Sequence, residues 1–95
     1  MPKFWKIEGY DGLNKIFYIE IPKLSITNEN IERILQLLCS KYLSEREIIG
    51  HFINNRKFNN LNRYIVRNSF LEIKRERGLV SCGENPYFTA IVITK

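Results

Sequence analysis

The side chains with the clearest capacity for chemistry lie between Arg56 and Arg77, where basic residues alternate with asparagines. This segment sets seven positive charges against Glu72 and Glu76, which accounts for the whole formal net charge of +5. Arginine and asparagine can hydrogen-bond base edges in the major groove, and arginine, lysine and tyrosine can hold phosphates. An excess of charge confined to one segment is typical of a surface that binds a polyanion, most often nucleic acid.

The same segment has a helical periodicity. At about 100° per residue it separates into two faces, so we predict a helix over about 59–77. Its apolar face contains Phe58, Leu61, Ile65, Val66, Ser69, Phe70 and Ile73. Its polar face contains Asn60, Arg63, Tyr64, Arg67, Asn68, Leu71 and Lys74. Leu71 is the apolar exception, and it either contacts a thymine methyl or a partner subunit or indicates a displaced helix phase.

The candidate DNA-binding residues divide by their expected targets. Arg63, Arg67 and Asn68 are expected to contact bases. Phosphates are expected to be held mainly by Arg56, Lys57, Lys74 and Arg75. Asn60 and Tyr64 complete the set on the same polar face. The alternative for the whole segment is a solvated helix face without a ligand.

Residue types suited to catalysis or metal binding are sparse. His51 is the only histidine, and Cys39 and Cys82 are far apart with no CxxC spacing. A structural zinc site therefore has too few soft ligands, and both thiols are expected to be reduced and structural. A nuclease built on His51 and Glu47 is a weak alternative, because there is no acidic cluster for a metal. We expect no enzyme activity, no cofactor and no small-molecule ligand.

Two hairpins are predicted at the ends of the chain. Residues 3–8 and 15–21 alternate in polarity around the Asp11-Gly12 turn, and Pro22 closes the second strand. That strand is apolar on both faces, so one face is expected to meet a helix or another chain. The second hairpin is formed by residues 79–82 and 88–94, joined by the turn residues 83–86.

Capping signals predict two helices between these hairpins. Thr27 is the expected N-cap of a helix with a buried stripe at Ile31, Ile34, Leu35, Leu38 and Tyr42. Ser44 and Glu47 form a capping box that starts a second helix, which is expected to run to about Ile53. This second helix is expected to bury Ile48, Ile49 and Phe52. The basic helix over 59–77 is then expected to end at Gly78.

Three helices followed by a hairpin, with the third helix basic, resemble a winged helix-turn-helix domain. The resemblance lies in residues 43–49, LSEREII, and in residues 70–80, FLEIKRERGLV, and it covers about 28–94. It implies an α+β fold in which the third helix enters the major groove and the hairpin forms the wing. The chain is then one domain, 1–95, with a hairpin extension at 1–22 and a winged-helix core at 27–95.

The expected function is sequence-specific binding of double-stranded DNA by a small transcriptional regulator. The alternative is a protein-interaction module, such as a viral or plasmid-encoded inhibitor of a host complex. Binding of single strands, with Tyr64, Tyr87 and Phe88 stacking on bases, is a third possibility, although such aromatic residues usually belong to the core.

The N-terminal hairpin is expected to join two copies into a homodimer, or else to pair with residues 88–94 within one chain. No signal peptide or membrane span is evident, so a cytoplasmic location and no membrane partner are expected.

Overall fold

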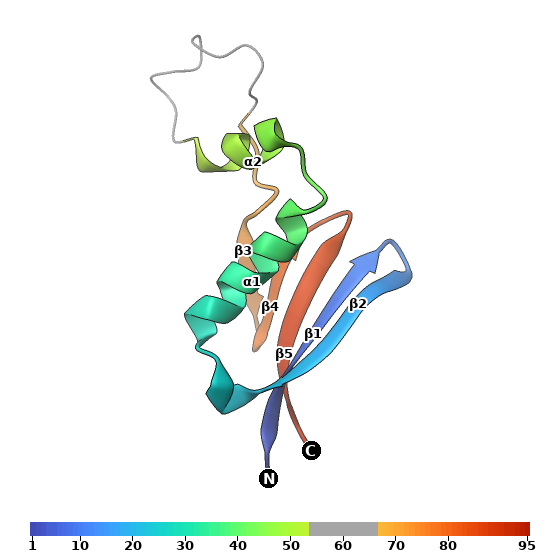
Figure 1. Cartoon of the computed structure of the whole chain (residues 1–95), viewed down its shortest axis with the longest axis vertical. Coiled ribbons are helices and arrows are strands. Elements are labelled where there is room, and N and C mark those ends of the chain that lie inside the picture. Colours follow the sequence, from blue (N-terminus) through green and yellow to red (C-terminus); the bar gives the residue numbers. More distant parts are fainter. Residues whose placement is uncertain (54–66) are drawn as a thin grey trace.

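The structure, a computed structural model, describes residues 1–53 and 67–95. It contains an antiparallel sheet of five strands in the order β2-β1-β5-β4-β3 (Figure 1). The strands are β1 (Lys3–Asp11), β2 (Asn14–Pro22), β3 (Ile73–Glu76), β4 (Leu79–Gly83) and β5 (Tyr87–Thr94). The 3-10 helix η1 (Lys23–Ser25) and the helices α1 (Asn28–Ser40) and α2 (Glu45–Phe52) follow β2.

Both predicted hairpins are present. β1 and β2 pair around Gly12, and β4 and β5 pair around residues 84–86. β1 also pairs with β5 along nearly all of its length, from Lys3 opposite Thr94 to Tyr10 opposite Tyr87. Of the two arrangements expected for the N-terminal hairpin, the single chain therefore shows the second, in which the hairpin pairs with the strand at residues 88–94. β1 lies inside the sheet, and β2 forms one edge.

The two helix starts agree with their capping signals. The Thr27 side chain accepts a hydrogen bond from the backbone N–H of Asn30, and α1 begins at Asn28. Ser44 and Glu47 form the reciprocal capping box at the start of α2. Side chains that cap their own helix satisfy backbone donors without tertiary contacts, which is why these starts could be predicted locally.

The core lies between α1 and one face of the sheet, which we call the inner face. α1 packs on β4 and β5. Residues from both layers, together with Leu71 from the turn before β3, are fully or almost fully buried here: Trp5, Ile7, Ile31, Leu35, Cys39, Leu71, Cys82, Phe88 and Ala90. The opposite side of the sheet, the outer face, has no helix packed on it in the described parts of the chain.

The winged helix-turn-helix prediction is wrong. The described chain is mostly strand, with two α-helices, and residues 73–76 of the expected third helix form β3, which pairs with β4. Arg77 and Gly78 make the tight turn between these strands, with φ values of 50° and 81°. Positive φ at both central residues is typical of a hairpin turn, so Gly78 belongs to a turn between two strands and does not end a helix. The earlier part of that predicted helix, residues 59–66, lies outside the described residues.

The predicted faces are also reversed at Phe70 and Leu71, in the turn shortly before β3. Leu71, expected on the exposed face, is 2% exposed and belongs to the core, whereas Phe70, expected to be buried, is 40% exposed. The side chain of Gln36 on α1 donates a hydrogen bond to the backbone oxygen of Leu71 at 2.8 Å. Burial of Leu71 therefore reflects docking of the turn before β3 against α1, and neither a DNA contact nor a displaced helix phase accounts for it.

One expectation about α2 is also corrected. Ile49 and Phe52 were expected to be buried, but they are 47% and 65% exposed. α2 lies beyond the end of the sheet (Figure 1), so among the described residues only one side of it faces the rest of the chain. Its buried residue is Gly50.

Candidate functional site

The predicted DNA-binding residues are only partly described. Arg56, Lys57, Asn60, Arg63 and Tyr64 lie outside the described residues. Arg67 and Asn68 precede β3, and Lys74 and Arg75 belong to it. The structure therefore places Arg67 and Asn68 on a segment without regular secondary structure, and Lys74 and Arg75 on an edge strand.

Asn68 has an internal structural role. Its side-chain amide donates to the backbone oxygen of Glu47 at 2.9 Å, and its side-chain oxygen accepts from the backbone N–H of Phe70 at 3.0 Å. Its own backbone N–H donates to the oxygen of Gly50 at 3.3 Å. These bonds attach α2 to the segment that leads into β3.

Arg75 is held by a carboxylate of α1. Its Nε and Nη2 atoms each lie 2.5 Å from an oxygen of Glu32, which is the bidentate geometry of an arginine–carboxylate ion pair. The carboxylate raises the pKa of the Arg75 guanidinium. Arg75 therefore connects the edge strand to the helix, and its charge is already balanced.

Lys74 and Arg67 are in a different situation. In the antiparallel register Ile73 lies opposite Cys82 and Lys74 opposite Ser81, so Lys74 faces the outer side of the sheet. Both cations are exposed, and neither forms an ion pair with a described residue. Within the described chain they are the members of the predicted set that remain available to a ligand.

The charges on the outer face near β1 and β2 are largely balanced. Glu8 forms ion pairs with Lys15 at 3.0 Å and Lys6 at 3.4 Å, and it accepts a 2.7 Å hydrogen bond from Tyr10. The hydrogen bonds from Tyr10 and Lys15 lower the pKa of Glu8.

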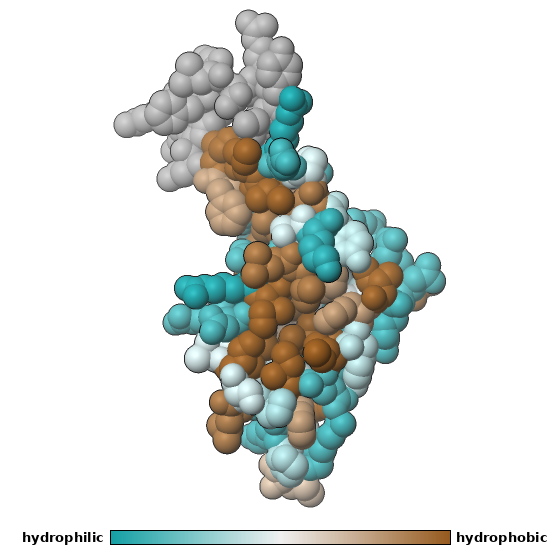
Figure 2. Space-filling model, in the orientation of Figure 1, coloured by the Kyte–Doolittle hydropathy of each residue, from teal (hydrophilic) through white to brown (hydrophobic). Residues whose placement is uncertain are grey.

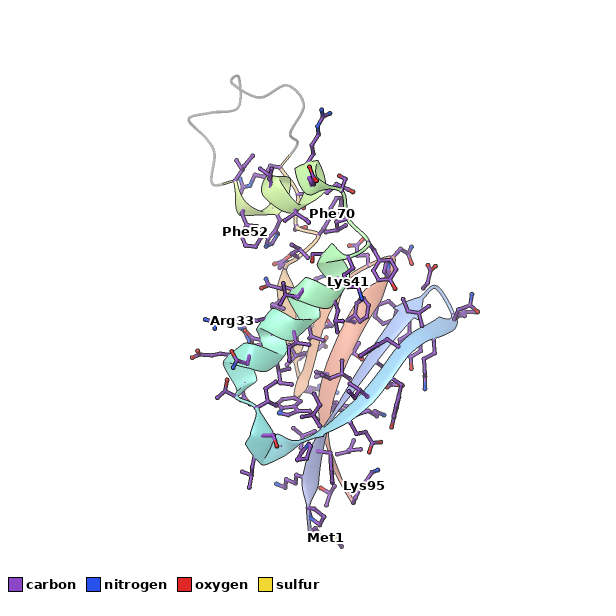
Figure 3. All side chains as sticks on the ribbon, in the orientation of Figure 1. Met1, Arg33, Lys41, Phe52, Phe70 and Lys95 are labelled. Atoms are coloured by element: carbon purple, nitrogen blue, oxygen red, sulfur yellow. The ribbon has the colours of Figure 1, made fainter. Side chains whose placement is uncertain are left out.

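Glu20 is paired in the same way at the other end of this face. It binds Lys95 and accepts a hydrogen bond from Tyr18, and both lower its pKa. The backbone of Lys95 also donates to Pro2 at 3.0 Å, beside the N-terminus (Figure 3). Since these lysines are occupied by carboxylates, this half of the sheet has little positive charge to offer a polyanion.

The aromatic residues considered for base stacking have separate environments. Phe88 is 1% exposed and belongs to the core, and Tyr64 lies outside the described residues. Tyr87 stacks on Tyr10, with ring centroids 5.3 Å apart and an interplanar angle of 20°. Phe88 is therefore a core residue and not a base-stacking one, and Tyr87 already has an aromatic partner.

Strand β2 is an edge with unusual exposure of apolar groups. Ile16, Tyr18 and Ile19 are 39%, 48% and 42% exposed. Phe17, Ile19 and Ile21 lie opposite Gly9, Ile7 and Trp5 of β1, so they belong to the inner face. Figure 2, which shows the side of the molecule that bears α1, has apolar surface over α1 and the sheet beside it.

Two internal contacts of the described chain could not be read from the sequence. Glu32 and Arg75 are 43 residues apart in the sequence, and so are Cys39 and Cys82.

His51 lies edge-on to the ring of Phe52 at 4.8 Å, and its Nδ1 atom is buried. Among the described residues no group of three His, Cys, Asp or Glu side chains could hold a metal ion.

Comparison with known proteins gives no relative. No family model matches the chain, and no curated protein or solved structure is significantly similar. In the parts of the chain that the structure describes, no helix is both long and apolar enough to cross a membrane.

Proposed function

We propose that the protein is a homodimeric DNA-binding protein in which β2 forms the dimer and the β3 side meets the duplex. The observation that carries this proposal is the chemical difference between the two edges of the sheet. β2 has nine residues and exposes apolar side chains on both faces, whereas β3 has four residues, three of them charged. Because these strands are at opposite ends of the sheet, pairing through β2 leaves β3 accessible.

The proposed occupant of the β2 edge is a second copy of the same strand. A long edge strand with unpaired backbone groups readily pairs with its own copy across a two-fold axis. In an antiparallel register centred on Ile19, Phe17 lies opposite Ile21 of the other copy, and the apolar inner faces join. The same register sets Tyr18 opposite Glu20 of the other copy, so a donor faces an acceptor on the outer side.

The proposed partner of the β3 side is the phosphate backbone of duplex DNA. Arg67, Lys74 and Arg77 are exposed, and residues 54–66 add Arg56, Lys57 and Arg63 without an acidic residue. Phosphate contacts of this kind supply affinity that does not depend on base sequence. Since residues 67–77 are not helical, the proposal includes no base reading by a helix.

Sedimentation of the intact chain and of two variants tests the dimer. Ile19→Asp places a carboxylate at the centre of the proposed interface, beside its own copy, and is expected to give a monomer. Leu24→Asp makes the same chemical change at a fully exposed residue of η1 and should leave the dimer intact. Circular dichroism verifies that both variants fold. A monomeric wild-type protein at tens of micromolar removes the homodimer from the proposal.

A protein-interaction module is the second candidate function, and one observation favours it. Phe52 and Phe70 are exposed at one end of the molecule (Figure 3), and Phe52 lines the same surface hollow as Arg67. Apolar groups beside a cation suit an acidic protein better than a phosphate backbone. Competition for the protein between labelled duplex DNA and polyglutamate separates the two functions. Displacement of the duplex only by excess unlabelled DNA supports the first, and tighter binding of polyglutamate supports the second.

A further inference from the structure

The two cysteines, Cys39 on α1 and Cys82 on β4, meet in the core. The thiol of Cys39 donates a hydrogen bond to the backbone oxygen of Cys82 at 3.0 Å. The residues are 3% and 1% exposed, and both sulfurs are free thiols. The helix and the strand therefore hold the two cysteines next to each other in the core, and a disulfide requires such an arrangement.

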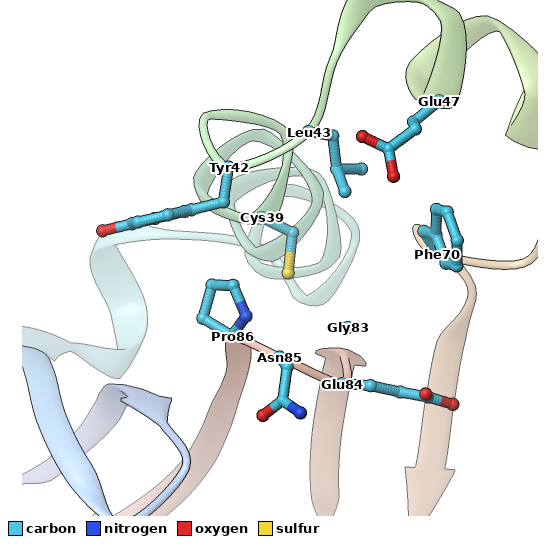
Figure 4. Close-up of a pocket in the computed structure, with 9 residues that line it drawn as sticks. All are labelled: Cys39, Tyr42, Leu43, Glu47, Phe70, Gly83, Glu84, Asn85 and Pro86. Atoms are coloured by element: carbon cyan, nitrogen blue, oxygen red, sulfur yellow. The ribbon is translucent and has the colours of Figure 1, made fainter.

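A cavity gives access to one of these sulfurs. It has a volume of about 230 Å³ and is lined by Cys39, Leu43, Phe70, Gly83 and Pro86, among others. Figure 4 shows the Cys39 sulfur directed into this space, with Pro86 on one side and Phe70 on the other. Cys82 does not line the cavity. A small polar oxidant would therefore reach Cys39 first.

The electrostatics of the pair assign the same order. The hydrogen bond from Cys82 and a further one from the backbone of Phe88 lower the pKa of the Cys39 thiol, although burial opposes them. The pKa of Cys82 is raised, first by its bond to Cys39 and then by burial. Since the cavity reaches the Cys39 sulfur and the thiolate is the reactive form, we assign Cys39 as the nucleophile of the pair and Cys82 as the thiol that follows.

We propose that Cys39 and Cys82 form an intramolecular disulfide when the protein encounters hydrogen peroxide. The Cys39 thiolate attacks one peroxide oxygen, the O–O bond breaks, and the departing hydroxide takes up a proton as water, which leaves a sulfenic acid on Cys39. The sulfur of Cys82 then attacks the Cys39 sulfur, the S–O bond breaks, and the hydroxyl leaves as water with the Cys82 proton. Two thiols are oxidised and one peroxide is reduced to two waters.

This bond would join α1 to β4 across 43 residues of sequence, a span that contains α2 and the basic residues between Arg56 and Arg77. Cross-links that close long loops stabilise a fold mainly by restricting the unfolded chain. The oxidised protein is therefore expected to unfold at a temperature at least about 10 °C above that of the reduced protein. This inference is independent of the proposed DNA binding and dimerisation.

Intact-mass spectrometry of the folded wild-type protein after treatment with hydrogen peroxide tests the proposal. A disulfide appears as a loss of about 2 Da, with one cross-linked peptide after digestion and full reversal by dithiothreitol. In Cys82→Ser the reaction is expected to stop at a sulfenic acid on Cys39 that dimedone traps, whereas Cys39→Ser should leave Cys82 unmodified.

The proposal is overturned if both thiols of the wild-type protein remain alkylatable after peroxide treatment. It is equally overturned if the sulfurs join different molecules, which mass spectrometry detects as a covalent dimer. The wild-type measurement does not depend on the folding of either variant, so the variants serve only to assign the order of attack.

Discussion

Gly83 occupies a position where a side chain has neither a favourable backbone conformation nor space. Its φ is +89°, and an added Cβ would lie 2.6 Å from the backbone oxygen of Pro86 and 2.7 Å from the Cys39 sulfur. Gly83→Ala is therefore expected to lower the free energy of unfolding by about 2–4 kcal/mol, from backbone strain together with overpacking. Urea denaturation measures this loss.

Gly12 provides the matched control for that substitution. Its φ is +62°, but a Cβ there would meet nothing within 4 Å. Gly12→Ala should cost only the backbone strain, about 1 kcal/mol. Equal losses for the two variants would show that the contacts around Gly83 contribute nothing to its requirement for glycine.

Glu8 gives the fold a specific dependence on acid. The bonds from Tyr10 and Lys15 lower its pKa in the folded state below the ordinary value of 4.5. A carboxylate with a lowered folded pKa stabilises the protein above the unfolded pKa, and this contribution disappears as the pH falls through the folded pKa. The free energy of unfolding should therefore decrease below about pH 4.5 in the wild type and decrease less in Glu8→Gln.

Urea denaturation at neutral and acidic pH measures this difference. Glu84→Gln, at an exposed turn residue, serves as the control and should retain the wild-type response. If Glu8→Gln also loses stability in acid as steeply as the wild type, Glu8 is not the titrating group. In Glu8→Gln a smaller loss of stability in acid should remain, because the pKa of Glu20 is also lowered.

At the scale of elements, strand β3 places two cations that are neighbours in sequence on opposite faces of the sheet. Lys74 is exposed on the outer side, whereas Arg75 is bound by both oxygens of Glu32. Lys74→Ala is expected to weaken duplex binding several-fold, because one phosphate contact is lost. Arg75→Ala should change DNA affinity less and instead lower the free energy of unfolding slightly, because an exposed ion pair contributes little to stability.

Fluorescence anisotropy with a labelled duplex and urea denaturation measure both effects on the same two variants. A larger loss of DNA affinity from Arg75→Ala than from Lys74→Ala would mean that the ion pair with Glu32 opens on binding. That result would contradict the assignment of Arg75 as a structural residue.

The elements that local signals define were predictable from sequence. Thr27 and the Ser44–Glu47 box mark helix starts, and the turn at Gly12 marks a hairpin. β3 was not predictable, because its four residues also fit a helical pattern, and a glycine such as Gly78 ends a helix as readily as it makes a hairpin turn. Pairing with β4 decides between the two, and that pairing depends on the tertiary fold.

At the scale of the whole molecule, the decisive feature is the pairing of β1 with β5, which joins the two hairpins into one sheet. These strands come from the two ends of the chain, and the sequence allowed the N-terminal hairpin to pair within one chain or between two copies. Pairing of β1 with β5 buries Trp5 and Ile7 under α1, while β2 is left as the exposed edge. Contacts between distant residues, such as Cys39 with Cys82, have no local signal at all.

The same arrangement sets the geometry of the proposed dimer. Joining two sheets through β2 gives ten strands, with the two β3 edges at the far ends. Nine strand spacings correspond to roughly 43 Å before twist is considered. This is of the same order as the 34–36 Å between successive half-sites on one side of a duplex. A dimer of this kind could therefore place both basic edges on one DNA molecule.

The most direct test of DNA binding is an anisotropy titration of random-sequence duplex at two salt concentrations. With about five phosphates contacted, the affinity should fall with a log–log slope of about −4.5, which is roughly 500-fold between 50 mM and 200 mM salt. Binding without this salt dependence, or no binding at the lower salt concentration, would contradict the central claim that the basic segment and the β3 side form a surface for DNA.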